Sequence, residues 1–345
     1  MADRRRIKGS KFLIMLSAAA LVCASVPVRA QAPDLFARKT ITIYIGNTVG
    51  GSYDLYGRMV ARFLGRHLPG NPNVIAENMP GAGTIVAANF IYGAAPKDGT
   101  VLGIVSETLP VEQALDNPAV KFDMAKYTWI GRVASSNNVH MMWNTSKVQS
   151  IEDAKLYEVP VAGTGPGNIA ETVPTLLNQV IGTKFKIVTG YPAANEAMLA
   201  MERGEVDGAV AGWAALKIGK KDWLAQKKIK IILQDVTERA ADLPDTPTLV
   251  EVGRTPEERQ MLGLYASGGA IGRAILAPPG LSTEVTKALR DGFNAMVKDP
   301  DFIAEMNRIE LDLDPLPGEV LQKTAADILD IPPEVKDRAK TIFGR

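Results

Sequence analysis

Short β-branched runs alternate with longer segments of helical periodicity along most of the chain, and this alternation constrains the fold most. The runs at 41–45, 74–76 and 101–105 are expected to form buried strands. The segments 55–63 and 84–92 between them have the apolar spacing of helices. Because parallel strands need crossover connections, this order favours a parallel sheet with helices on both faces.

A second set of alternating segments follows residue 132. Strands are expected at 139–143, 159–161, 185–188, 208–210 and 229–233, and helices at 169–180, 193–203 and 213–226. After a polar, proline-rich passage, a strand is expected at 270–276, followed by helices at 282–298, 301–308 and 319–329.

The two sets predict an α/β fold of two lobes, each a doubly wound, mostly parallel sheet with helices on both faces. The chain is expected to cross between the lobes near 129–136 and again near Gln234. The first lobe would then consist of residues 38–132 and 235–345, and the second of residues 133–234. A chain of this length has room for two such units.

The first 30 residues have the pattern of a cleavable secretory signal peptide. An apolar stretch from Phe12 to Val26 lies between a basic head and the small-residue site Val28-Arg29-Ala30; the head consists of Arg4, Arg5, Arg6, Lys8 and Lys11. Cleavage is expected after Ala30 or after Ala32. The stretch is shorter than the roughly 20 residues that span a bilayer, so we expect a soluble mature protein outside the cytoplasm.

Two variants of this export signal stay open. The arginine run also occurs in twin-arginine signals, although the following Ile7-Lys8-Gly9 matches that pattern poorly. Cys23 would be the acylated residue of a lipoprotein, although Val22 stands where a small residue is required. Both variants lead outside the cytoplasm.

Removal of the signal peptide changes the cysteine content and the charge balance of the mature chain. Cys23 is the only cysteine, so the mature chain has no disulfide, thiol nucleophile or thiolate ligand. His67 and His140 are the only histidines and lack a metal-ligand spacing, and we expect no metal and no cofactor. The signal holds six of the 39 Lys/Arg and one of the 38 Asp/Glu residues, which leaves 33 basic against 37 acidic residues. This balance argues against nucleic acid or an anionic membrane as a partner.

Three glycine-rich loops follow expected strands, at 48–54, 80–84 and 162–168. In open α/β sheets ligands bind beyond the carboxyl ends of strands, where backbone amides and helix N-termini attract anions. Two such loops facing each other would hold a small anion. The candidate ligand-binding residues are Val49, Gly50, Gly51, Ser52, Tyr53, Asp54, Gly163, Thr164, Gly165, Gly167 and Asn168. Each loop taken alone is equally typical of a tight strand-to-helix turn, in which Ser52 caps its helix and Asp54 complements the dipole.

Five motifs occur in order along the mature chain. They are Val49 to Arg58 (VGGSYDLYGR), Glu77 to Gly83 (ENMPGAG), Ala94 to Leu102 (AAPKDGTVL), Leu243 to Glu251 (LPDTPTLVE) and Ala277 to Gly280 (APPG). Their order and spacing resemble the Bug family, the TctC-like receptors of tripartite tricarboxylate transporters. The resemblance extends from about residue 39 to residue 329.

The resemblance implies a periplasmic binding protein of the two-lobed type II fold that closes about a hinge. Members hold small carboxylates through backbone amides, hydroxyl groups and bound water, and deliver them to the membrane permease subunits of a tripartite transporter. By position, the family's binding loops fall on 50–54 and 163–168, and Ser106 and Thr108 follow the third strand as ligand-facing polar residues. We expect a monomer.

Departures from the family pattern concern the ligand. Ser52 and Tyr53 stand where the family has glycine and threonine, and the segment 188–192 (VTGYP) departs from a VPYKG-like motif. Tyr53, Tyr191 and Trp213 would suit an aromatic or extended acid as well as a di- or tricarboxylate. Each of the three is otherwise an ordinary core or rim residue.

Two competing functions differ in kind from a transport receptor. Two observations argue against a Rossmann-like or other enzyme. The glycine pattern Gly81-Ala82-Gly83 lacks the acidic residue about 20 positions later that a dinucleotide-binding fingerprint requires, and the sequence has no G-x-S-x-G motif of a hydrolase. A sensor that presents its ligand to an extracytoplasmic signalling partner uses the same lobe closure as a transport receptor. The sequence leaves the sensor open.

Overall fold

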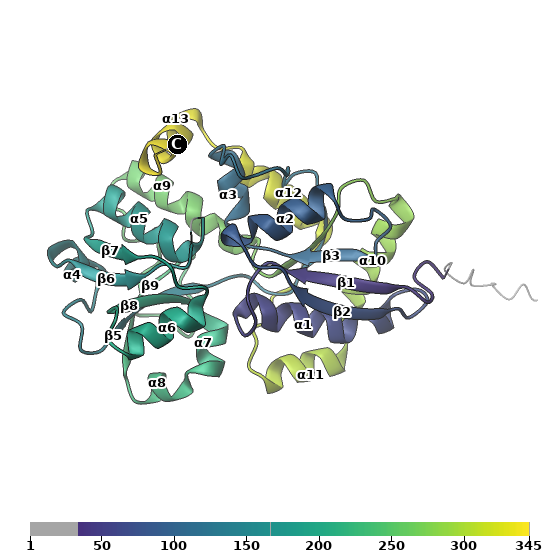
Figure 1. Cartoon of the computed structure of the whole chain (residues 1–345), viewed down its shortest axis with the longest axis horizontal. Coiled ribbons are helices and arrows are strands. Elements are labelled where there is room, and N and C mark those ends of the chain that lie inside the picture. The colour runs from purple at the N-terminus through teal and green to yellow at the C-terminus, as the bar shows by residue number, and fades with distance from the viewer. Residues whose placement is uncertain (1–33, 166, 345) are drawn as a thin grey trace, which may run out of the picture. The chain divides into compact units, whose positions relative to one another are not determined.

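The computed structural model describes residues 34–165 and 167–344, which fall within one compact unit that begins at Pro33. The expected signal peptide lies outside the described residues. Two β-sheets, each flanked by helices, make up this unit (Figure 1).

The first sheet has the strand order β11-β4-β10-β3-β1-β2. β1 pairs in parallel with β2 and β3, whereas β10 runs antiparallel to β3 and β4, and β11 antiparallel to β4. The strands are β1 Thr40–Ile45, β2 Asn73–Asn78, β3 Val101–Ile104, β4 Thr128–Arg132, β10 Ala274–Ala277 and β11 Leu316–Pro317.

The second sheet has the order β7-β6-β8-β5-β9. β6 pairs in parallel with β7 and β8, and β5 runs antiparallel between β8 and β9. The strands are β5 Asn138–Trp143, β6 Val159–Ala162, β7 Phe185–Val188, β8 Gly208–Gly212 and β9 Ile229–Gln234. These strands all fall within the range expected for the second lobe; the lobe boundaries themselves stay a prediction.

Helices cover both faces of each sheet (Figure 1). The helices are α1 Ser52–Leu64, α2 Ile85–Gly93, α3 Leu109–Ala114, α4 Ile151–Leu156, α5 Ile169–Ile181, α6 Ala194–Glu202, α7 Trp213–Gly219, α8 Lys221–Ala225, α9 Pro256–Ala266, α10 Thr283–Met296, α11 Pro300–Arg308, α12 Gly318–Leu329 and α13 Pro333–Ile342. Short 3-10 turns occur at Gly65–His67, Ala82–Thr84 and Ser267–Ala270.

The two-residue periodicity of the strands explains the three apolar cores. In β1, Ile41, Ile43 and Ile45 face α1, α10 and α11, whereas Tyr44 faces the opposite core. In β5, Met141 faces the core formed with α6 to α8. Successive strand side chains point to opposite faces, so each buried strand contributes to two cores.

The sequence expectation omitted α3, α4, α13 and the short strand β11 as well as α9, and it differed at two further places. The helix expected at 213–226 is two short helices, α7 and α8, because the backbone of Lys220 leaves the helical region at φ −133°. The first chain crossing, expected at 129–136, begins only after β4, because Thr128–Arg132 is an interior strand of the first sheet and β5 of the second sheet begins at Asn138. The helix α9 was not predicted; it begins at a capping box formed by Thr255 and Glu258 and packs with α13 against α5.

Within the described residues, no helix has both the length and the apolar character needed to cross a membrane.

Candidate functional site

A polar pocket of about 150 Å³ lies where loops from both sheets meet. Residues 46–48 and 51–53 enter it from the β1–α1 connection, 80–84 follow β2, and Ser106 and Glu107 follow β3. The second sheet contributes the ends of β5 and β8, the start of α5, and residues 192–194 before α6. Arg273, which precedes β10, completes the lining.

The N-terminus of α1 opens into this pocket. Its N-cap, Gly51, provides no side-chain hydrogen bond, and Gly51, Ser52 and Tyr53 all line the pocket. The first amides of a helix have no intrahelical acceptor, and the aligned peptide dipoles give this end a partial positive charge. The arrangement is suited to an anion.

Asp54 organises the loop before α1. Its carboxylate accepts from the Gly50 amide at 2.9 Å, from Arg58 Nε at 3.0 Å and from Asn78 Nδ2 at 2.9 Å. Burial alone would raise the pKa of Asp54, but these donors outweigh burial and hold the pKa below its usual value. The Gly50 amide is therefore bonded within the loop.

A second helix N-terminus reaches the pocket from the other sheet. The N-cap of α6 is Ala193, which has no side chain able to cap, and residues 192–194 line the pocket. The sequence had instead indicated α5, but Asn168 caps α5 by accepting from the Ala170 amide at 3.0 Å. The Gly165 amide donates to Glu171 at 2.7 Å. α1 and α6 therefore both begin at the pocket without a side-chain cap. Thr84 before α2 and Gly212 before α7 also line the pocket without capping, but the first amides of α2 bond to the carbonyls of Gly81 and Ala82, and the Trp213 amide bonds to Asn137.

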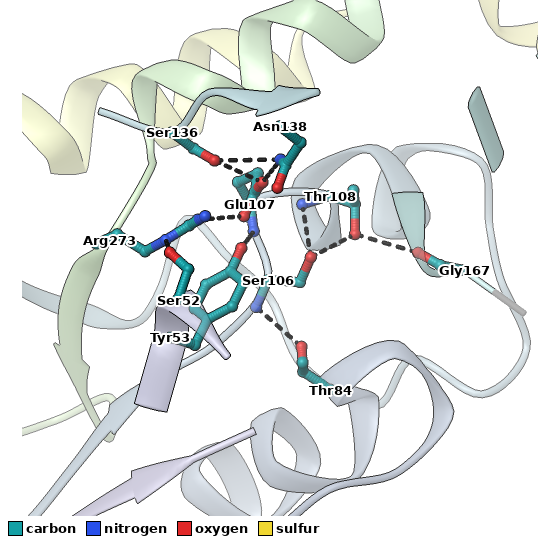
Figure 2. Close-up of polar contacts among 10 residues, drawn as sticks. All are labelled: Ser52, Tyr53, Thr84, Ser106, Glu107, Thr108, Ser136, Asn138, Gly167 and Arg273. Atoms are coloured by element: carbon teal, nitrogen blue, oxygen red, sulfur yellow. Dashed lines mark hydrogen bonds and ion pairs between the residues drawn. The ribbon is translucent and has the colours of Figure 1, made fainter. Parts of the chain in front are cut away.

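A buried ion pair forms one wall (Figure 2). Arg273 Nη1 lies 3.0 Å from Glu107 Oε2, Arg273 Nε donates to Ser52 Oγ at 2.8 Å, and the guanidinium stacks 4.0 Å from the Tyr53 ring centroid. Glu107 Oε1 also accepts from Ser136 Oγ at 2.9 Å and Asn138 Nδ2 at 2.7 Å. Arg273 and Glu107 are only 2% and 3% exposed, so each needs the other as its counter-ion.

The loop before α2 has an unusual backbone. Gly81, Ala82, Gly83 and Thr84 all have positive φ, and the value for the buried, β-branched Thr84 is +77°. Thr84 Oγ1 accepts from the Ser106 amide at 2.9 Å, which holds it in place (Figure 2). Such strain persists only where surrounding contacts enforce it, and it concentrates at ligand sites.

Hydroxyl groups extend from this loop to the second sheet. Ser106 Oγ lies 2.8 Å from Thr108 Oγ1, and Thr108 Oγ1 donates to the Gly167 carbonyl at 3.2 Å. Thr108 thus connects the β3–α3 loop with the loop that precedes α5 (Figure 2).

The candidate residues from the sequence have different positions relative to this pocket. Those in its lining are Gly51, Ser52, Tyr53, Ser106, Thr164 and Asn168, and those outside it are Val49, Gly50, Asp54, Thr108, Gly163, Gly165, Gly167, Tyr191 and Trp213. Trp213 lines a neighbouring cavity of about 320 Å³, and its Nε1 donates to Asp242. Contact between ligand and any of these candidate residues stays a prediction.

Sequence reasoning missed Glu107, Asn138, Arg273 and the start of α6. The only local signal for Arg273 is a charge directly before the apolar run that forms β10, and Glu107 adjoins the predicted Ser106. Their pairing joins positions 166 residues apart, so no local pattern contains it.

A larger cavity, about 620 Å³, lies between the two chain crossings and the helices α9, α12 and α13. Its lining has the carboxylates Glu238, Asp327 and Asp330 and no lysine or arginine. The negative charge of this lining disfavours binding of an anion. The smaller pocket instead has two helix N-termini, whose partial positive charge favours an anion. The smaller pocket is therefore the candidate site.

Each of the two histidines lies within hydrogen-bonding distance of an aspartate. His67 Nε2 is 2.8 Å from Asp299, and the buried His140 Nε2 is 2.9 Å from Asp235. Burial raises the pKa of Asp235, and His140 opposes this effect. Among residues 34–165 and 167–344, no three His, Cys, Asp or Glu side chains are placed to hold a metal ion.

Comparison with known proteins gives consistent results. A sequence model described as the tripartite tricarboxylate transporter family receptor, TctC, matches residues 57–330. A Cupriavidus necator protein described as a "UPF0065 protein in gbd 5'region" is 26% identical over 308 residues, which cover 87% of this chain and 86% of that protein.

Solved structures show the same fold. The periplasmic binding protein BugD is 19% identical with a TM-score of 0.69, and the match covers 88% of this chain and 97% of BugD. MatC from Rhodopseudomonas palustris, solved with bound malate, is 18% identical with a TM-score of 0.66 over 88% and 98% of the two chains. An R. palustris protein solved with adipate is 18% identical with a TM-score of 0.67 over 87% and 97%.

Proposed function

Since this chain belongs to the tripartite tricarboxylate transporter family of receptors, we propose that it captures a small aliphatic carboxylate in the pocket between α1 and α6. Membership in this family agrees with the resemblance found in the sequence. The family consists of receptors, which agrees with the expectation that the chain is not an enzyme. The structural neighbours with bound malate and adipate support a carboxylate as ligand.

The observation that carries the proposal is the convergence of two uncapped helix N-termini on one pocket. The N-caps Gly51 and Ala193 leave the first amides of both helices available to an anion. A charge-assisted hydrogen bond contributes about 1.5–3 kcal/mol. A few such bonds, less the cost of association, support micromolar or tighter binding.

Pocket size limits the length of the ligand, and the positions of the aromatic residues favour an aliphatic over an aromatic acid. A cavity of about 150 Å³ accepts a benzene-sized molecule, so we expect a ligand of about six to nine non-hydrogen atoms. One face of Tyr53 is covered by Arg273, and Tyr191 and Trp213 are not in the lining. Tyr53, which alone of the three lines the pocket, is 8% exposed, so little of its ring is open to an aromatic ligand.

Calorimetric titration of the purified mature protein with small carboxylates tests the proposal. Gly51→Leu adds a side chain at the pocket, where a Cβ meets nothing closer than 4.0 Å, so the variant should fold. The matched control is Gly93→Leu, at an exposed position at the end of α2 with open space around its Cβ. We expect binding to be lost in the first variant and kept in the second. Equal affinity in both would refute the assignment of this pocket.

The place of action and the partner are part of the proposal. The export signal expected at 1–30 would direct the chain to the periplasm, where closure on ligand would create the surface recognised by permease subunits. Fractionation of cells should find the cleaved protein in the periplasm. Ligand-dependent co-purification with a permease supports transport, and co-purification with a sensor protein instead would replace that part of the proposal.

A further inference from the structure

The charge of the pocket lining is balanced within the protein. Among the described lining residues, the only charged side chains are Arg273 and Glu107, and they form an ion pair at 3.0 Å. Glu107 accepts hydrogen bonds from Arg273, Ser136 and Asn138, so three of the roughly four acceptor positions of its carboxylate are occupied by the protein. The side chains therefore add no net positive charge to the site.

The ion pair just outside the lining is balanced as well. Asp54 and Arg58 lie 2.9 Å apart directly behind the loop that precedes α1. The positive charge available to a ligand is then chiefly that of the N-termini of α1 and α6. Each helix N-terminus is equivalent to about half a positive charge, so the two together provide about one.

From this balance we infer that the site selects a small monocarboxylate over the matching dicarboxylate, and that Glu107 is the residue that sets this selectivity. The inference rests on the function proposed above. Glu107 cancels the charge of Arg273 and holds its guanidinium beside Ser52. The guanidinium therefore acts as a hydrogen-bond donor without adding net positive charge to the site. A second carboxylate on the ligand enters a site where no positive charge is left for it, close to the carboxylate of Glu107.

Matched ligand pairs test the inference in the unmodified mature protein. The probes are butanoate against succinate and 2-hydroxybutanoate against malate, measured by calorimetry at pH 7.5 and low salt. We expect the monocarboxylate of each pair to bind more tightly by about tenfold or more, because the helix N-termini supply about one positive charge and the neutral Arg273–Glu107 pair supplies none for a second carboxylate. Equal or tighter binding of succinate and malate overturns the inference.

Charge-altering variants identify Glu107 as the cause. Glu107→Gln should shift the ratio of affinities toward the dicarboxylate by about tenfold. Arg273→Gln should weaken every anion, and the double variant, which again has no net charge, should restore the monocarboxylate preference. The control Glu238→Gln removes an exposed glutamate of the larger cavity and should leave the ratio unchanged. An unchanged ratio in folded Glu107→Gln also overturns the assignment.

Failure of this inference is distinguishable from failure of the proposed function. If no carboxylate of either class binds, the proposed function fails. If dicarboxylates bind more tightly, carboxylate capture stands and only the selectivity is wrong. Circular dichroism and thermal unfolding verify the fold of each variant, and the comparison in the unmodified protein decides the question if Glu107→Gln does not fold.

Discussion

The buried Arg273–Glu107 ion pair predicts how the free energy of unfolding changes when one or both partners are replaced. Arg273→Met removes the guanidinium and leaves the Glu107 carboxylate, which is 3% exposed, with only Ser136 and Asn138 as partners. Loss of one partner of a buried ion pair costs about 3–5 kcal/mol, and we expect the lower end because two donors remain. Arg273→Met combined with Glu107→Gln removes both charges, and we expect that double variant to lose only about 1 kcal/mol.

Urea unfolding without ligand at pH 7.5 measures these differences. The three variants Arg273→Met, Glu107→Gln and the double variant complete the cycle with the unmodified protein. Coincident circular dichroism and fluorescence transitions, with unchanged slope, are needed for the free energies to be comparable. A loss below about 1 kcal/mol in Arg273→Met, or a double variant at least as unstable as the sum of the singles, contradicts the reasoning.

Three further predictions concern single positions. Asp54→Asn should lower the free energy of unfolding, measured by urea titration, by about 1–3 kcal/mol. Because the pKa of Asp54 is lowered in the folded state, this deficit should be full above about pH 5 and shrink as the pH falls below about 4; a deficit independent of pH contradicts the assignment. Gly131→Ala places a Cβ 2.2 Å from the ring of Phe293 and should lower stability by about 1–3 kcal/mol by denaturant titration, whereas a neutral effect would mean that the ring moves freely. Gly46→Ala places a Cβ 2.6 Å from Thr84 Cβ, so calorimetry should find weaker carboxylate binding in a protein that still folds.

The fold was largely predictable because its signals are local. Strand runs such as 41–45 and the helices between them have periodicities that a short window contains. The errors occurred where tertiary contacts or a single dihedral angle decide. The apolar spacing of 213–226 continues through Lys220, whose backbone nevertheless ends α7. The segment at Trp129 forms a strand because β10, far along the chain, pairs with it.

The site was predictable only in part, for the same reason. Glycines before a helix mark the start of α1, because glycine is a common N-cap residue that has no side chain to bond the first amides. The start of α6 has no such mark, since Ala193 is neither a glycine nor a capping residue. Asn168, a preferred N-cap residue directly before the predicted helix at 169–180, was a readable sign that fewer amides of α5 are left for a ligand. The partnership of Glu107 with Arg273 depends on the folded chain.

The central claim is that a carboxylate binds between the N-termini of α1 and α6, and a crystal structure of the mature protein with its tightest-binding small carboxylate tests this most directly. The account predicts carboxylate oxygens within hydrogen-bonding distance, about 2.7–3.2 Å, of the first amides of α1 near Ser52 and of α6 near Ala194. A carboxylate bound in the cavity beside α13, or against α5 with the starts of α1 and α6 unoccupied, would contradict it.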